Sequence, residues 1–394
     1  MPSPNNCGMD LDRLGRIRSF MQQYVDDGKL AGIVTLVARH GEVVHLEAVG
    51  MADLESSAAM ASDTIFRIYS MTKPITSVAV MMLHEQGRVL LSAPASTYIP
   101  AFADLRVYDP KNPEGLEPER PMTVRDLLMH TAGLAYWRDH PVAQAHAEAS
   151  LHAGTLGEMI RKLGDLPLRD HPGTVWRYGR STDVLGYLVE VVSGLPFDEY
   201  LAQKIFTPLG MADTAFYVPE DKRDRFAAIY IVDTSSSKLA PIAEAPVGPF
   251  LTPPAIPFGG AGLVSTAPDY YRFAQMLLNG GELDGIRLLG RKTVEMMTCD
   301  HLRPDMTLST DDLGIPLNLQ GLGFGLGFSV VRDAAQTGTA GTDGTYSWGG
   351  AATTWFWVDP RENLVGMIMT QMIPMTKYPI ADEFRALMYQ ALVD

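Results

Sequence analysis

The stretch Ser70-Met71-Thr72-Lys73 decides how the rest of this chain is interpreted. Alternating apolar residues over 64–69 predict a short strand, and the apolar run over 71–86 predicts a buried helix. Residues three apart share a helix face, so the Ser70 hydroxyl is expected beside the Lys73 amine, among the free N–H groups of the helix N-terminus. A lysine that activates a serine must lose its proton, which burial and neighbouring positive charge favour.

The Ser-x-x-Lys spacing carries little weight by itself. A chain of this length contains roughly one such spacing by chance, and Ser235-Ser236-Ser237-Lys238 is a second copy. That copy lies in a polar run that predicts a solvent-exposed loop. The interpretation of Ser70 therefore depends on what else the chain contains.

Composition limits the class of protein. The chain has 394 residues, of which 46% are hydrophobic and 20% charged, so it has enough apolar surface for two or three globular domains. A net charge of −14 argues against a nucleic-acid or anionic-membrane partner. We find no signal peptide and no apolar run long enough to span a bilayer, so we expect a cytoplasmic protein. Cys7 and Cys299 suggest neither a disulfide nor a metal site.

The order of predicted elements divides the chain. Residues 1–90 and 225–394 predict an α/β portion built from both chain ends, and residues 91–224 predict a mainly helical portion with the functional cleft between the two. A hairpin is expected at His40-Gly41. The other expected strands are 326–331, 353–358 and 364–369, and the expected helices include 10–24, 124–130, 156–163, 181–192, 267–278 and 380–392.

Five segments resemble one known superfamily in both content and order. They are Phe66–Pro74 with the Ser-x-x-Lys, Thr123–Leu134, Pro172–Ser181 with Tyr178, Gly259–Thr266, and Tyr346–Ala351. Together they resemble the serine β-lactamases and penicillin-binding proteins, and within that superfamily the family VIII carboxylesterases. The resemblance covers residues 10 to 392. It implies a β-lactamase-like α/β (α+β) fold, with an antiparallel sheet flanked by helices and an all-helical inserted domain.

The resemblance assigns roles to individual residues. It implies that Ser70 is the nucleophile and that Lys73 and Tyr178 form a general-base pair, which is chemically reasonable because two adjacent groups of similar basicity can share a proton. It also implies that the backbone N–H groups of Ser70 and Ala351 hold the oxyanion. No metal and no cofactor is implied, and no Gly-x-Ser-x-Gly elbow suggests an α/β-hydrolase.

Two positions depart from the lactamase pattern. Trp348-Gly349-Gly350 stands where lactamases carry Lys-Thr-Gly, so a cation for a substrate carboxylate is replaced by an indole. Arg180 stands two residues after Tyr178, where class C enzymes have asparagine. Both departures favour neutral, apolar esters over lactams. A second interpretation makes Arg180 a replacement cation, which keeps a weak β-lactamase activity open.

Further residues are expected near the substrate. Trp348 is predicted to line the acyl pocket, and Gly349 and Gly350 are predicted to let the substrate approach the strand backbone. Tyr136, Trp137 and Phe324 are weaker candidates for the cleft wall, and for each a place in the core is at least as plausible.

The chain is thus predicted to be a serine carboxylesterase that hydrolyses short-chain neutral acyl esters through an acyl-enzyme on Ser70. A β-lactamase or amide hydrolase and an acyltransferase remain alternatives on the same fold. A catalytically inactive scaffold is the non-enzyme alternative. The expected partner is a small-molecule ester, and the sequence gives no prediction of oligomeric state.

Overall fold

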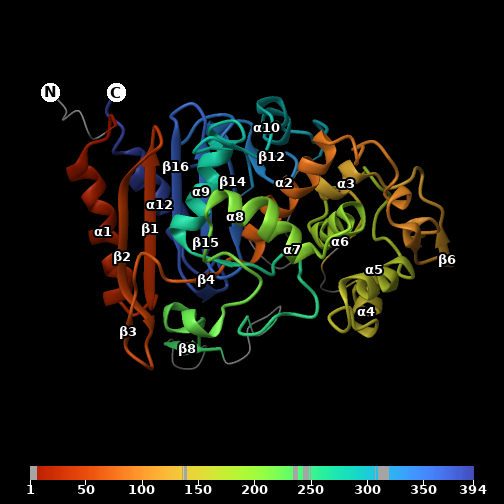
Figure 1. Ribbon diagram of the computed structural model, residues 1–394, viewed down its shortest axis with the longest axis horizontal. Helices are drawn as coiled ribbons and strands as arrows, with labels where there is room; N and C mark the ends of the chain where they lie inside the picture. The colour runs from red at the N-terminus through yellow and green to blue at the C-terminus, as the bar shows by residue number, and fades with distance from the viewer. Residues whose placement is uncertain are drawn as a thin grey trace.

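An eight-stranded antiparallel sheet forms the centre of the computed structural model (Figure 1), which describes residues 7–134, 136, 140–233, 238–242, 248, 250–306, 308 and 319–394. The strand order is β12-β13-β14-β15-β16-β1-β2-β3, so the two ends of the chain pair directly through β16 and β1. The bounds are β1 Gly32–Arg39, β2 Glu42–Asp53, β3 Ala58–Ala59, β12 Leu322–Phe324, β13 Ser329–Val331, β14 Tyr346–Gly350, β15 Thr354–Asp359 and β16 Leu364–Met369.

The predicted hairpin is confirmed, because β1 and β2 turn at His40 and Gly41, whose φ angles are 53° and 82°. The predicted strand over residues 326–331 is too long at its N-terminal end. Gly327 has a φ of 100°, and a Cβ atom there would lie 2.3 Å from Ser77 Oγ. The chain bends where Gly327 passes Ser77, so β13 begins only at Ser329.

Helices cover both faces of the sheet. One face packs against α1 Leu11–Asp26 and α12 Ile380–Tyr389, and the other packs against α9 Ala267–Leu278 (Figure 1). Every residue of β1 is buried, because its alternating side chains enter two different cores. Val34 and Leu36 belong to the core that continues into the helical part, whereas Ile33 and Val37 belong to the core beneath α1 and α12.

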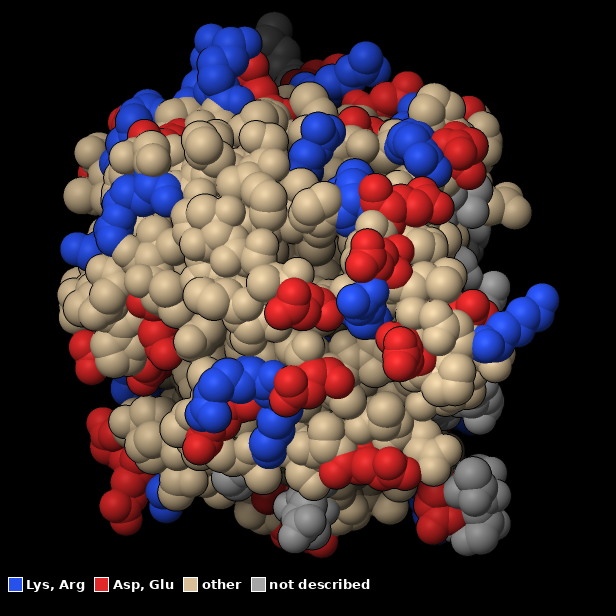
Figure 2. All heavy atoms as spheres, turned by 90° about the vertical axis from the view of Figure 1, so that its right-hand side faces the viewer, with Lys and Arg blue, Asp and Glu red and all other residues tan. Residues whose placement is uncertain are grey.

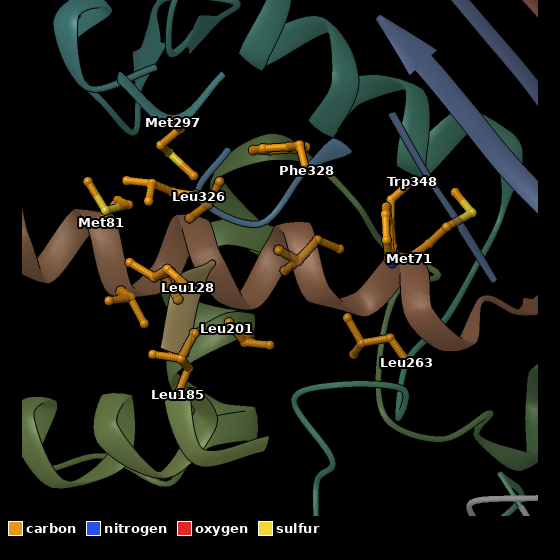
Figure 3. Close-up of a cluster of buried hydrophobic side chains, with 14 of the residues drawn as sticks. Met71, Met81, Leu128, Leu185, Leu201, Leu263, Met297, Leu326, Phe328 and Trp348 are labelled. Atoms are coloured by element: carbon orange, nitrogen blue, oxygen red, sulfur yellow. The ribbon is translucent and has the colours of Figure 1, made fainter. Parts of the chain in front are cut away.

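Helix α2, Thr72–Glu85, lies in the larger core and is apolar on nearly all sides. Figure 3 shows Leu128 and Leu185 packed on one side of it and Leu326 and Phe328 on the other. The helix is buried from Thr72 to Met81, whereas Glu85 at its C-terminal end is exposed. The helix therefore holds its first turn in a fixed position relative to both the sheet and the helical segment.

Most of the remaining helices lie between the sheet strands in the sequence. They are α3 Val124–Leu128, α4 Pro141–Glu148, α5 Leu156–Gly164, α6 Ser181–Ser193, α7 Phe197–Leu201, α8 Thr207–Leu209, α10 Arg291–Met297 and α11 Ala334–Thr337. The division into two domains stays a prediction. On the end of the molecule seen in Figure 2, acidic and basic side chains are interspersed.

Three short strand pairs and one three-stranded sheet are also found among the described residues. These are β4 Phe66–Arg67 with β9 Val264–Ser265, β5 Val107–Asp109 with β6 Asn112–Leu116, β10 Glu282–Leu283 with β11 Ile286–Arg287, and β17 Met372–Ile373 with β7 Tyr230–Val232 and β8 Leu239–Pro241. The β5–β6 hairpin interrupts a segment predicted to be helical. None of the helices in the described part of the chain combines the length and the apolar character needed to cross a membrane.

Candidate active site

Ser70 lies on a single 3₁₀ turn, Tyr69–Met71, immediately before α2. Strand β4 leads into this turn, and Ile68 N–H donates to Leu263 O at 3.1 Å. Tyr69 has a φ of 41°, a conformation that non-glycine residues rarely adopt. The backbone before the helix is thus fixed in an unusual conformation, and Ser70 remains partly exposed at the helix N-terminus.

Lys73 lies one turn further along, as predicted, and its side chain is buried. Its Nζ donates to Ser70 Oγ at 3.3 Å and to Gly260 O at 2.7 Å. Burial lowers the pKa of Lys73, but the neighbouring Tyr136 and Tyr178, together with Asp183, raise it by more, so the net pKa lies above its ordinary value. The neighbours of Lys73 thus oppose the loss of a proton that its burial favours.

Tyr178 lies in a cluster of aromatic rings beside Lys73. The Lys73 Nζ is 4.6 Å from the centroid of the Tyr178 ring. Trp176 stacks on Tyr178 with an interplanar angle of 18°, and the His130 ring centroid lies 4.9 Å from that of Tyr178. Burial and the Lys73 charge hold the pKa of His130 well below its usual range, so His130 is a neutral packing residue. The cluster fixes the Tyr178 ring.

Trp348 contacts Tyr178 directly. Its indole Nε1–H donates to the Tyr178 hydroxyl oxygen at 3.4 Å, a long bond, and the two ring centroids are 5.4 Å apart. Phe324, only 1% exposed, packs edge-on against Trp348. The sequence assigned Trp348 to the pocket wall, but this contact with Tyr178 required the structure.

The glycines of β14 are needed for packing within the protein. A Cβ atom on Gly349 would lie 2.5 Å from the Trp355 ring, and one on Gly350 would lie 2.3 Å from Ile68 O. The close approach of a substrate to these glycines stays a prediction. Gly349 still lines the cavity described next.

A cavity of about 400 Å³ opens beside Ser70, Tyr178 and Trp348, and Ala351 also lines it. It extends along the face of β14 and β15 that α12 covers. Its floor there contains Trp355 and Trp357, whose rings stack with centroids 6.0 Å apart and an interplanar angle of 8°. Sequence analysis did not identify this aromatic floor, because the two tryptophans have the alternating spacing of any buried strand.

Among the described residues, the cation Arg385 and the carboxylate Asp382, both from α12, also line the cavity. Arg385 is 8% exposed and donates to Ala340 O at 3.2 Å. Burial raises the pKa of Asp382, although Arg385 opposes this effect. The two formal charges cancel, so this part of the cavity favours neutral groups.

Arg180 does not line the cavity, although it was considered as a substrate-binding cation. It is 3% exposed and lies 3.2 Å from His152 Nε2 and 3.9 Å from Asp183 Oδ2. Its guanidinium is 5.6 Å from the centroid of the Tyr136 ring. Arg180 is thus buried against Asp183 and Tyr136 and does not line the cavity.

Tyr136 lies with the proposed catalytic groups. Its ring centroid is 5.4 Å from Lys73 Nζ and 5.6 Å from the Tyr178 ring centroid. Trp137 and Ser235, the serine of the second Ser-x-x-Lys copy, lie outside the described residues. Among the residues that are described, no group of three or more His, Cys, Asp or Glu side chains is arranged to hold a metal ion.

A model of the family described as Beta-lactamase matches residues 17–389 of this sequence. The chain belongs to the beta-lactamase family. Protein Rv1367c of Mycobacterium tuberculosis is 35% identical over 363 residues, covering 90% of this chain and 89% of that protein. Esterase EstB of Burkholderia gladioli is 32% identical over 378 residues, covering 90% of this chain and 89% of that one.

A solved structure agrees with this assignment. "EstCE1, a hydrolase with promiscuous acyltransferase activity" superposes with a TM-score of 0.81 at 29% identity, covering 96% of this chain and 99% of that chain. The resemblance to family VIII esterases and the predicted fold class are confirmed. The chain is a serine hydrolase with a β-lactamase-like fold and has esterases among its relatives.

Proposed function

We propose that the protein is a serine carboxylesterase that hydrolyses neutral esters with short acyl chains through an acyl-enzyme on Ser70. The observation that carries the proposal is the 3.3 Å contact between Lys73 Nζ and Ser70 Oγ at one end of the cavity. The proposed nucleophile, one member of the proposed base pair and space for a substrate would thus occur together. The esterase among the relatives supports the same reaction class.

The reaction would proceed in two halves. Ser70 Oγ attacks the ester carbonyl carbon while its proton passes to the Lys73/Tyr178 pair, and the N–H groups of Ser70 and Ala351 stabilise the oxyanion. The alcohol then leaves with a proton from the pair. Water attacks the acyl-enzyme with the pair again accepting a proton, and the pair returns this proton to Ser70 Oγ as the acyl–Oγ bond breaks and the acid is released.

The charges around the pair indicate which atom accepts the serine proton. Since its neighbours raise the pKa of Lys73, the pair must lose one proton before it can act as a base. Lys73 lies beside the Tyr178 ring, and the Trp348 N–H donates to the Tyr178 hydroxyl oxygen. We therefore infer that Lys73 stays charged and that the Tyr178 oxygen receives the proton.

Acyl transfer to an alcohol is the second candidate. The cavity of about 400 Å³ has room for an alcohol beside an acylated Ser70, and EstCE1 is described as having acyltransferase activity. Adding a primary alcohol during hydrolysis and measuring the new ester by gas chromatography tests this candidate. If the rate of acid release is unchanged and no new ester forms, the acyl-transfer candidate is rejected and only hydrolysis is retained.

We expect p-nitrophenyl butyrate to be hydrolysed with a kcat/KM at least about 10-fold above that for nitrocefin. A hydrogen bond to a charged group is worth about 1.5–3 kcal/mol, which is a factor of roughly 10–100. Trp348 offers one neutral donor where a lactamase lysine would bind the carboxylate. Initial rates for both substrates under the same conditions measure the ratio. A higher kcat/KM for nitrocefin would contradict the esterase assignment and favour a lactamase.

Trp348→Lys tests whether Trp348 is the reason for the expected preference for neutral esters over lactams. The change removes the indole donor to Tyr178 and places a second cation near Lys73, so esterase activity should fall. Nitrocefin turnover should not rise to an efficient level, because Arg180 is buried against Asp183 and does not restore the asparagine of class C enzymes. An efficient lactamase created by this one substitution would show that Trp348 alone sets the specificity.

A further inference from the structure

A buried carboxylate lies behind Lys73 that the proposed reaction does not use. Asp183, in the first turn of α6, is 2% exposed, and its Oδ1 accepts the Gly260 N–H at 2.8 Å. The carbonyl oxygen of the same Gly260 accepts from Lys73 Nζ at 2.7 Å. Asp183 is therefore linked to Lys73 through a single backbone residue.

The glycine in this link is held tightly. A Cβ atom on Gly260 would lie 2.9 Å from Asp183 Oδ1 and 3.0 Å from the Tyr136 hydroxyl oxygen. The preceding residue, Gly259, accepts a hydrogen bond from Thr76 Oγ1 of α2 at 2.7 Å. The segment is thus fixed between α2 and α6, so the direction of the Gly260 carbonyl depends on both helices.

Arg180 adds the opposing charge. It precedes Asp183 by three residues, and the two side chains are 3.9 Å apart and almost completely buried. Burial raises the pKa of Asp183, and Arg180, Lys73 and the Gly260 N–H oppose this effect. With an ionised Asp183, Arg180 and a charged Lys73, the cluster has a net charge of +1. Loss of one proton from the Lys73/Tyr178 pair makes the cluster neutral, which a buried environment favours.

The other ionisable groups around the cluster do not change this charge near neutral pH. Burial raises the pKa of Tyr136, and burial lowers the pKa of His130, His146 and His152. The tyrosine and the three histidines therefore remain neutral. The balance between Asp183 and Arg180 decides the local field at Lys73.

We propose that Asp183 is a positioning residue that holds Lys73 through Gly260, and that Asp183 and Arg180 set, in opposite directions, the pH at which the Lys73/Tyr178 pair loses its proton. This inference rests on the proposed function, because it assumes that the pair is the base. It assigns to Arg180 an electrostatic role in place of the substrate contact that its position in the sequence suggested.

The test compares the pH dependence of two variants. Asp183→Asn keeps an oxygen that can accept the Gly260 N–H but removes the negative charge that opposes loss of a proton from the Lys73/Tyr178 pair, so the acid limb of kcat/KM should move down by about one pH unit. Arg180→Gln removes the cation that opposes Asp183, so the acid limb should move up. Asp183→Ala also removes the hydrogen bond and should lower kcat with little change in KM.

Asp269→Asn is the matched control. Asp269 is also a buried carboxylate in the first turn of a helix, and it accepts the Asp213 N–H at 2.7 Å, but it contacts Thr214 instead of the Lys73 cluster. The acid limb of the kcat/KM profile of Asp269→Asn should coincide with that of the wild type. Circular dichroism establishes that each variant is folded, and Arg180→Gln carries the test if Asp183→Asn does not fold.

The labelling rate of Ser70 by a fluorophosphonate, measured against pH, separates this inference from the proposed function. Labelling reports activation of the serine whatever the natural substrate is. Opposite shifts of the labelling profile in the two variants support the inference even if ester hydrolysis is absent. An unshifted profile in folded Asp183→Asn, or shifts of both variants in the same direction, would overturn it.

Discussion

Ser70→Ala is expected to lower kcat/KM for p-nitrophenyl butyrate on the order of 10⁴-fold or more, because it removes the atom that forms the acyl-enzyme. The fold should persist, since Ser70 is partly exposed on a 3₁₀ turn and its side-chain hydroxyl serves mainly as an acceptor for Lys73. Initial rates and the thermal unfolding midpoint measure the two effects. Intact-mass spectrometry should find one fluorophosphonate adduct on the wild type and none on the variant.

Ser235→Ala is the control for this experiment. Ser235 begins the second Ser-x-x-Lys copy, in a polar run without a following apolar helix, so its removal should leave both the rate and the labelling unchanged. A folded Ser70→Ala protein that retains full activity would disprove the nucleophile assignment. Absence of labelling in the wild type as well would favour the inactive scaffold.

The second large effect concerns Lys73 and Tyr178. Each of Lys73→Ala and Tyr178→Phe should lower kcat on the order of 10²–10⁴-fold, the usual contribution of positioned acid–base catalysis. The double variant should lose little more than the worse single one, because one proton is shared between two groups that act together. Stopped-flow measurement of p-nitrophenol release gives the acylation rate of each variant.

Tyr187→Phe provides a control for the tyrosine change. Tyr187 lies in the same helical part of the chain, in α6, and packs against Gly157 of α5 instead of Lys73. It should retain the wild-type rate. Losses that multiply in the Lys73→Ala/Tyr178→Phe double variant would contradict a shared proton and indicate two separate catalytic steps.

The contact between Trp348 and Tyr178 extends the explanation of specificity. The sequence identified a missing lysine and therefore predicted lost carboxylate binding. In the structure the indole N–H also donates to the Tyr178 hydroxyl, so the same side chain takes part in holding the proposed base. The presence of Trp348 in place of the lactamase lysine thus has two effects. It removes a cation from the site, and it supplies a hydrogen-bond donor to the proposed base, Tyr178.

The sequence by itself determined the features that depend on local pattern. Ser70 and Lys73 are three residues apart at the start of an apolar helix, so helix geometry alone brings them together. The His40-Gly41 turn and the strands β15 and β16 also follow from short-range turn and alternation signals. The order of the motif segments was sufficient to predict the fold class.

Only the tertiary structure decided which distant groups surround that pair. Gly260 accepts from Lys73 across 187 residues of sequence, and Asp183 reaches Gly260 across 77. No local pattern encodes such contacts, because they depend on how α2, α6 and the Gly259–Gly260 segment pack. The same packing buries Arg180 against Asp183 and sets the pKa of Lys73 by the balance of burial against neighbouring charge, a balance that residue spacing does not contain.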